Sequence, residues 1–329
     1  MRIAIMDDWQ GVARGAADWS AVESRAEVVV LNEPFADEDA AAAALADFGI
    51  LVPMRERTEL SATLIARLPK LRLIALTGGR SQTLALDACT AAGVLVCNTG
   101  GERSLIGTAE LTLGLMLAAA RFIPAGDAAI RAGKFQHGVG VGPVLNGRTL
   151  GIIGLGKIGA RMAGYGRALG MTVLAWSPNL TEDAAQAAGA RRVAKDELLA
   201  QSDVISLHVV LSARSRGMIG AADLAAMKPG AILVNTSRGS LVEEAALLEA
   251  LHAGRIHAAL DVYAQEPLPP RHPLRTAPNT VLTPHLGYGT RDTFAQFYGE
   301  SVQNILAFLD GAPIRVLNPD ALNRPRSTA

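Results

Sequence analysis

The chain has 329 residues, of which 50% are hydrophobic and 19% charged. This length predicts two domains at roughly 150 residues each, and the apolar content excludes a disordered chain. The 31 Lys and Arg residues balance the 31 Asp and Glu residues, so no basic excess is available for nucleic acid or an acidic membrane surface. Only Cys89 and Cys97 are present, which indicates a reducing compartment rather than a disulfide framework.

The sequence shows no targeting or membrane segment. Asp7 and Asp8 follow the first apolar run at once, so no signal peptide is predicted. The longest apolar stretch, 111–120, is much shorter than the ~20 residues that span a bilayer. We therefore expect a soluble, cytoplasmic protein with no membrane or nucleic-acid partner.

Short apolar runs alternate with helical patterns along the chain, which predicts an α/β fold with parallel sheets covered on both faces. Strands are expected at 3–6, 28–31, 50–52, 73–76 and 94–96, and then at 149–153, 172–176, 204–207, 231–234, 258–261 and 281–283. A long helical pattern, 102–131, separates the two series, with a break or kink expected at Pro124. The last helix, 291–309, is expected to pack back on the first domain, and the tail after Gly311 to be loosely held.

Residues 154–159 read Gly-Leu-Gly-Lys-Ile-Gly and have the spacing G-x-G-x-x-G. An apolar strand leads into this motif and a helical pattern leaves it, which is the context of a dinucleotide-binding turn. Gly154 permits the tight turn, Gly156 permits close approach of a pyrophosphate, and Gly159 permits helix–strand packing. The alternative is a glycine-rich turn without a ligand. The strand that follows ends at Ser177, where an acidic residue would bind the ribose, so the sequence leaves NAD or NADP open.

Four polar residues follow strands of the second series, at the edge where a parallel sheet binds its ligand. Arg238 can hold a carboxylate bidentately, and His285 can give or take a proton near neutrality. Glu266 would orient His285 and favour its charged form, and Asp261 ends the strand before it. Each residue alone has a structural explanation, but their order after the glycine motif favours hydride transfer with acid–base catalysis. No spacing of His or Cys typical of a metal site is present.

The chain resembles the D-isomer-specific 2-hydroxyacid dehydrogenase family over nearly its whole length. The resemblance lies in 108–111 (Thr-Ala-Glu-Leu), the glycine motif, 207–208 (Leu-His), 227–230 (Met-Lys-Pro-Gly), 235–239 (Asn-Thr-Ser-Arg-Gly), 260–263 (Leu-Asp-Val-Tyr), 266–267 (Glu-Pro) and 284–285 (Pro-His). It implies two Rossmann-like, doubly wound parallel-sheet domains with a cleft between them, and a homodimer formed largely through the cofactor domain. The expected substrate domain is 1–100 plus 288–329, and the expected dinucleotide-binding domain is 101–287.

The resemblance also implies site residues and a reaction, the interconversion of 2-oxo acids and D-2-hydroxy acids with NAD or NADP. The catalytic set is Arg238, Glu266 and His285. The cofactor set is Thr108, Gly154, Leu155, Gly156, Lys157, Ile158, Gly159, Ser177, Thr236, Asp261 and Gly287. The substrate residues that the resemblance implies are Arg238 and, in the loop 77–80, Gly78 and Gly79, whose backbone N–H groups hold the carboxylate. Arg55 and Tyr288 join the substrate set on other grounds. Arg55 follows the strand 50–52 and adds positive charge, although Arg57 or a surface ion pair explains this position equally well, and Tyr288 is a departure from the family.

Three positions depart from the family pattern. Ser177 replaces the usual acid, Val210 stands where many members have Pro, and Tyr288 stands where a second Gly is common. Tyr288 is expected to narrow the pocket or stack on the substrate. Two other functions remain as alternatives: a non-catalytic NAD(H) sensor or corepressor-like protein, and a dehydrogenase of the same superfamily that acts on another small anion such as formate.

Overall fold

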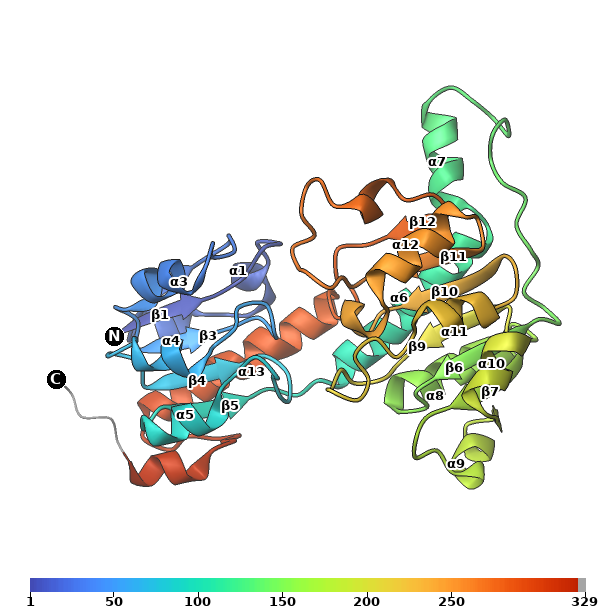
Figure 1. Ribbon diagram of the computed structural model, residues 1–329. Helices are drawn as coiled ribbons and strands as arrows, with labels where there is room; N and C mark the ends of the chain where they lie inside the picture. The colour runs from blue at the N-terminus through green and yellow to red at the C-terminus, as the bar shows by residue number, and fades with distance from the viewer. Residues whose placement is uncertain (325–329) are drawn as a thin grey trace. The chain divides into compact units, whose positions relative to one another are not determined.

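The computed structural model describes residues 1–324, which divide into two compact units. Unit 1 comprises residues 1–103 and the chain from Thr290 onwards, and unit 2 comprises Ser104–Gly289. Each unit contains one parallel β-sheet with helices in the connections (Figure 1). The predicted α/β class with two parallel-sheet domains is therefore confirmed. The predicted boundaries, after residues 100 and 287, lie close to the limits of the two units.

Unit 1 is built on a five-stranded sheet with the order β2-β1-β3-β4-β5. The order reverses beside β1, because β2 lies on one side of it and β3 on the other. Strands β1, β3, β4 and β5 are almost wholly apolar and buried, as expected where crossover helices cover both faces, whereas β2 at the sheet edge is partly exposed. The elements are β1 (Arg2–Ile5), α1 (Ala13–Ala16), α2 (Ser20–Glu23), β2 (Glu27–Val30), α3 (Glu38–Leu45), β3 (Ile50–Val52), α4 (Ala62–Ala66), β4 (Leu73–Leu76), α5 (Leu86–Ala91), β5 (Leu95–Asn98), α13 (Arg291–Leu309) and η3 (Pro319–Asn323).

The C-terminal part of the chain completes unit 1. Helix α13 packs against α1 and β4, as predicted, and buries Phe297 and Tyr298. The segment after it is held firmly, so the expectation of a loose tail is wrong for its described part. Asn318 accepts a hydrogen bond from the Val96 N–H at 2.8 Å and donates one to the Val94 carbonyl at 2.9 Å. These bonds provide hydrogen-bond partners for backbone groups at the outer edge of the sheet, along and directly before β5. The remaining tail, 325–329, lies outside the described residues.

Unit 2 is built on a seven-stranded sheet with the order β12-β11-β10-β9-β6-β7-β8. The order reverses between β6 and β9, since β7 and β8 continue on one side and β10 to β12 on the other. The elements are α6 (Glu102–Ala120), α7 (Ile123–Arg131), β6 (Thr149–Ile153), α8 (Lys157–Ala168), β7 (Thr172–Trp176), α9 (Glu182–Ala187), β8 (Arg191–Arg192), α10 (Lys195–Gln201), β9 (Val204–Leu207), α11 (Ala221–Ala226), β10 (Ala231–Asn235), η1 (Gly239–Leu241), α12 (Glu244–His252), β11 (Ile256–Leu260), η2 (Pro273–Thr276) and β12 (Thr280–Leu282). The two-residue strand β8 was not predicted.

The sheet of unit 2 is buried on both faces. Alternate residues of every strand except the exposed β8 enter opposite hydrophobic clusters, as the two-residue period of a strand requires. Ile153 and Leu207 pack with residues of α10, α11 and α12, whereas Leu150 and Ile152 pack with residues of α6 and α8. The strands are therefore rigid supports for the loops at their carboxyl ends.

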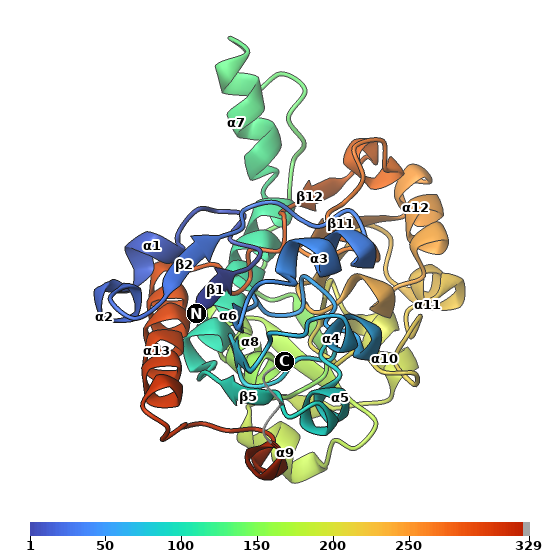
Figure 2. The same ribbon diagram turned by 90° about the vertical axis from the view of Figure 1, so that its left-hand side faces the viewer.

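The long helical pattern before β6 forms two helices. The break lies at Phe122, which has a left-handed backbone (φ 53°), and Pro124 instead occupies the first turn of α7. Proline is tolerated there because the first N–H groups of a helix have no partner in the helix. Helix α7 has no buried residue and projects from the body of unit 2 (Figures 1 and 2). Helix α6 is long and apolar enough to span a membrane by composition, but it packs in the core through residues such as Leu115 and Met116.

Candidate functional site

The glycine motif forms the turn between β6 and α8. Gly154 has a φ of +99°, and a Cβ atom there would lie 2.6 Å from the carbonyl oxygen of His208. A Cβ atom on Gly159 would lie 2.2 Å from the carbonyl oxygen of Gly154. Both positions require glycine for packing, so the end of β9, the turn and the first turn of α8 lie in close contact.

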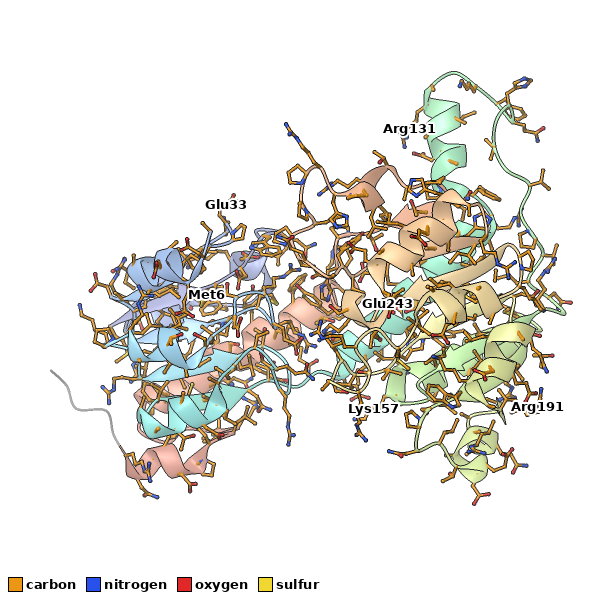
Figure 3. All side chains as sticks on the ribbon, in the orientation of Figure 1. Met6, Glu33, Arg131, Lys157, Arg191 and Glu243 are labelled. Atoms are coloured by element: carbon orange, nitrogen blue, oxygen red, sulfur yellow. The ribbon has the colours of Figure 1, made fainter. Side chains whose placement is uncertain are left out.

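Gly156 differs from the other two glycines. Its φ of −86° suits any residue, and a Cβ atom there would meet nothing within 4 Å. It is also the N-cap of α8, which has 12 residues, and it offers no side chain to the first N–H groups of that helix. A helix N-terminus with open space before it is a site for an anionic group such as a pyrophosphate. The residues present therefore fit a dinucleotide, and Lys157 at the start of α8 adds a positive charge (Figure 3).

The turn lies where the strand order of unit 2 reverses, between β6 and β9. In open parallel sheets ligands bind outside the carboxyl ends of the strands at this point. Ser177 follows β7 on one side of the turn, and Arg238, Asp261 and His285 lie in or beside the segments that follow β10, β11 and β12. The structure therefore assembles the predicted residues of unit 2 along one edge of one sheet.

His285 and Glu266 form a close pair. The Nδ1 atom of His285 lies 2.5 Å from Oε2 of Glu266, and about a quarter of each side chain is exposed. The second oxygen of Glu266, Oε1, accepts a hydrogen bond from the N–H of Tyr263 at 2.9 Å. Because Glu266 occupies Nδ1, the Nε2 atom of His285 is the ring nitrogen left to face a reactant. The pair is thus arranged for proton transfer through Nε2.

Asp261 holds the loop that carries His285. Its side chain is wholly buried, and burial raises its pKa. Oδ1 accepts hydrogen bonds from the Thr283 hydroxyl and the Leu286 N–H, at 2.6 and 2.7 Å, and Oδ2 accepts one from the Gly287 N–H at 2.8 Å. The Asp261 carbonyl also accepts a hydrogen bond from the His285 N–H at 2.8 Å. These contacts show Asp261 as a brace of the loop, a role that the sequence did not reveal.

Arg238 lies in the loop after β10, directly before η1. Asn235 fixes this loop, because its amide donates to the Arg238 carbonyl at 2.9 Å and accepts from the Ser237 N–H at 3.0 Å. The Arg238 guanidinium donates to the Ser237 carbonyl at 2.7 Å. A Cβ atom on Gly239 would lie 2.0 Å from the carbonyl carbon of Tyr263, so this loop packs tightly on the loop that carries Glu266.

Small polar residues of α6 contact the loops that follow β10 and β12. Thr112 of α6 shares a hydrogen bond with Thr236 at 2.8 Å, and its hydroxyl donates to the Thr108 carbonyl at 2.6 Å. A Cβ atom on Gly287 would lie 3.2 Å from Thr108 Oγ1 and from Asp261 Oδ2. Three predicted cofactor residues, Thr108, Thr236 and Gly287, are thus brought together with Asp261.

Tyr288 lies beside His285, with the ring centroids 5.8 Å apart and the planes at 73°. The residue is only 6% exposed. Its ring therefore packs edge-on near His285, and its expected effect on the pocket stays a prediction. Val210, by comparison, is 72% exposed in the loop after β9.

The predicted substrate residues of unit 1 also come together. Arg55 and Gly78 both have left-handed backbones, and a Cβ atom on Gly78 would lie 2.2 Å from Nη1 of Arg55. The Arg55 N–H donates to the Thr77 hydroxyl at 2.8 Å. Gly79 has open space at its Cβ position. The guanidinium is therefore seated directly against the glycine loop.

His208, directly after β9, entered the sequence prediction only through the family pattern at 207–208 and was given no role there. Burial lowers the pKa of His208 to about 4, so the imidazole is neutral in the folded protein. Its Nε2 atom lies 2.8 Å from the Ser206 hydroxyl, and its Nδ1 atom is buried with no hydrogen-bond partner in the part of the chain that is described. The pair Leu207–His208 gave no chemical signal by itself. Among residues 1–324, no three His, Cys, Asp or Glu side chains group as metal ligands.

Comparison with known proteins identifies the family of the chain. Residues 113–287 match the family profile described as "D-isomer specific 2-hydroxyacid dehydrogenase, NAD binding domain". The chain is 38% identical over 275 residues to a D-3-phosphoglycerate dehydrogenase of Archaeoglobus fulgidus, which covers 83% of this chain and 51% of the relative. It is 37% identical over 269 residues to a glyoxylate reductase of Aeropyrum pernix, which covers 79% of each chain. The chain thus spans about half the length of the first relative.

A solved oxidoreductase from Ralstonia solanacearum has the same fold. The two structures superpose with a TM-score of 0.91 at 41% sequence identity, over 98% of each chain. The family profile covers the glycine turn, Arg238, Glu266 and His285, and the likeness in structure extends through unit 1. The protein belongs to the D-isomer specific 2-hydroxyacid dehydrogenase family, and unit 2 contains the NAD-binding domain of that family.

Proposed function

We propose that the protein is an NAD(P)-dependent oxidoreductase that interconverts 2-oxo acids and D-2-hydroxy acids. The observation that carries this proposal is the pair formed by His285 and Glu266, 2.5 Å apart, in loops packed beside the loop of Arg238. The three groups lie on the same sheet edge as a turn that fits a dinucleotide. An acid–base pair, a carboxylate-binding cation and a coenzyme turn are the parts that this reaction requires.

Each residue has a proposed part in the reaction. The bound coenzyme supplies or accepts the hydride. Arg238 holds the substrate carboxylate with parallel N–H donors. Within unit 1, Arg55, Gly78 and Gly79 are proposed as substrate-binding residues. In the reductive direction His285 gives the proton on Nε2 to the ketone oxygen, and in the oxidative direction it removes the hydroxyl proton. Glu266 holds Nδ1, which fixes the ring and stabilises its positive charge.

The coenzyme is proposed to lie along the carboxyl edge of the unit 2 sheet. The first N–H groups of α8 would hold its pyrophosphate, and Ser177 would face the adenosine ribose. The proposed contacts are Thr108, residues 154–159, Ser177, Thr236, Asp261 and Gly287. Asp261 and Thr108 would act largely by holding the loop 283–287, in view of their hydrogen bonds and close contacts.

The proposed reaction is tested by absorbance at 340 nm with NADH and NADPH in parallel against glyoxylate, hydroxypyruvate, pyruvate and phenylpyruvate. We expect oxidation of reduced coenzyme with at least one of these acids, and its loss in Arg238→Ala. The matched control is Arg271→Ala, because Arg271 is exposed in the same connection as Glu266 but has no proposed part in the reaction. Tight coenzyme binding without turnover on any acid, or on formate with oxidised coenzyme, would favour the sensor function instead.

We also propose that the protein is a cytoplasmic homodimer that associates through unit 2. Helix α7 and the segment after it expose five large apolar side chains: Ile123, Ile130, Phe135, Val141 and Val144. Such a concentration on a projecting arm is typical of an interface. Analytical ultracentrifugation should give a dimer that Ile130→Lys with Phe135→Lys converts to monomer. A wild-type monomer would refute the association. Both cysteines are buried and neither is joined in a disulfide, which suits a reducing cytoplasm.

A further inference from the structure

The ribose end of the proposed coenzyme site lacks a negative charge at its usual position. Ser177 directly follows β7, where dinucleotide folds that select NAD place an Asp or Glu against the ribose hydroxyls. A carboxylate there would repel the 2′-phosphate that distinguishes NADP from NAD. Serine removes this repulsion and offers a hydroxyl donor. The absence of the acid permits NADP but does not by itself select it.

The unpredicted strand β8 brings an arginine to the same loop. It pairs in parallel with β7, with Arg192 in register with Ala175, two residues before Ser177. Arg192 Nε donates a hydrogen bond to the Leu180 carbonyl at 2.8 Å. The Leu180 N–H in turn donates to the Ser177 carbonyl at 3.1 Å, which closes the turn 177–180. The guanidinium of Arg192 is thus attached to the loop that begins with Ser177.

Of the two arginines of β8, only Arg192 contacts the loop that begins with Ser177, because Arg191 has other partners. Arg191 (labelled in Figure 3) donates to Glu197 at 3.0 Å and to Gln201 at 3.2 Å, both on α10 (labelled in Figure 1). Successive side chains of a strand point to opposite faces, so Arg192 points away from these partners. Within residues 1–324, no carboxylate lies within 4.0 Å of the Arg192 guanidinium, and its terminal nitrogens remain available as donors.

We propose that Arg192, together with Ser177, binds the 2′-phosphate and makes NADPH the preferred coenzyme of this protein. This inference rests on the proposed function, because it names the coenzyme of that same site. Arginine suits the task since its planar donors bind phosphate in pairs and its charge is permanent. Glu182 and Asp183, in the first turn of α9, weaken the positive field nearby, so a moderate preference is expected.

The test is the dissociation constant of each reduced coenzyme, measured by titration of its fluorescence without substrate. We expect wild-type protein to bind NADPH at least about tenfold more tightly than NADH, as for one charge-assisted contact. Arg192→Ala should weaken NADPH binding by that factor and leave NADH binding unchanged, and Arg192→Lys should retain part of the preference. Arg191→Ala is the matched control and should change neither constant. Ser177→Asp should reverse the preference.

Several results would overturn the proposal. Wild-type protein that binds NADH as tightly as NADPH would refute it outright. An equal loss for both coenzymes in Arg192→Ala would show that the arginine only supports the loop 177–180. If NADH is preferred and 2-oxo acids are still reduced, the proposed function stands and only this inference fails. If neither coenzyme binds, the proposed function fails with it.

Discussion

Two glycines of one motif are expected to give opposite results when each is replaced by alanine. Gly154→Ala places a methyl group 2.6 Å from the His208 carbonyl oxygen and 2.9 Å from a Val209 methyl carbon, at a φ of +99°. Backbone strain and overpacking each cost about 1–3 kcal/mol, so the free energy of unfolding should fall by about 2–6 kcal/mol. Gly156→Ala meets no atom within 4 Å at an ordinary φ, and its stability should stay within about 1 kcal/mol of wild type.

For coenzyme binding, measured per folded molecule, Gly156→Ala is expected to cause the larger loss and Gly154→Ala the smaller one. The methyl group of Gly156→Ala would occupy the open space before α8, where backbone N–H groups are proposed to meet the pyrophosphate. A lost hydrogen bond to a charged group is worth about 1.5–3 kcal/mol, so the dissociation constant should rise by about tenfold to a hundredfold. Gly164→Ala is the matched control, since it also meets open space in α8, and it should leave coenzyme binding unchanged.

Urea unfolding followed by tryptophan fluorescence measures the stability of the three variants, and NADH and NADPH titration measures binding. If Gly156→Ala bound both coenzymes like wild type, the space before α8 would not be the pyrophosphate site. If Gly156→Ala lost as much stability as Gly154→Ala, the two glycines would not differ in packing as described.

Three further predictions concern the catalytic loops and His208. His285→Ala should lower kcat/KM by about 10²–10⁴ with NADPH binding retained. Glu266→Gln keeps a hydrogen-bonding group at Nδ1 of His285 and should lower kcat by less. Equal losses in the two variants would contradict an orienting role for the Glu266 carboxylate. Tyr288→Gly should shift relative kcat/KM toward bulkier 2-oxo acids in a size series, and an unchanged series would reject its influence on the pocket. His208 is neutral when folded, with a pKa near 4 against 6.5 when unfolded, so stability should decline by up to about 3 kcal/mol as the pH falls from 6.5 to 4. Urea unfolding of His208→Gln should show a smaller decline, and an identical one would exclude His208 as the cause.

The sequence predicted the parts of the fold that depend on local patterns. Apolar runs placed most strands within one or two residues, and the glycine spacing identified the turn between β6 and α8. Strand β8 could not be predicted, because two arginines at a sheet edge have no apolar period. The order of Arg238, Glu266 and His285 along the chain was sufficient to group them, since each follows a strand of one parallel sheet.

Features that depend on distant contacts were missed. The C-terminal segment is held by hydrogen bonds of the Asn318 side chain, whose partners at Val94 and Val96 lie more than 200 residues earlier in the chain. The bracing role of Asp261 depends on hydrogen bonds to a loop that begins 22 residues later. Local sequence patterns do not encode such long-range hydrogen bonds, so they can be identified only in the folded structure.

The backbone of His285 carries a cost that bears on protein engineering. Its φ of 54° lies in the left-handed region, which a non-glycine residue occupies at an expense of about 1–3 kcal/mol. Asparagine and glycine adopt this conformation more readily than histidine. A selection for heat resistance that does not measure turnover is therefore expected to enrich Gly or Asn at position 285. The selected variants would be more stable, because the backbone strain at position 285 is relieved, but they would lack the proposed proton donor.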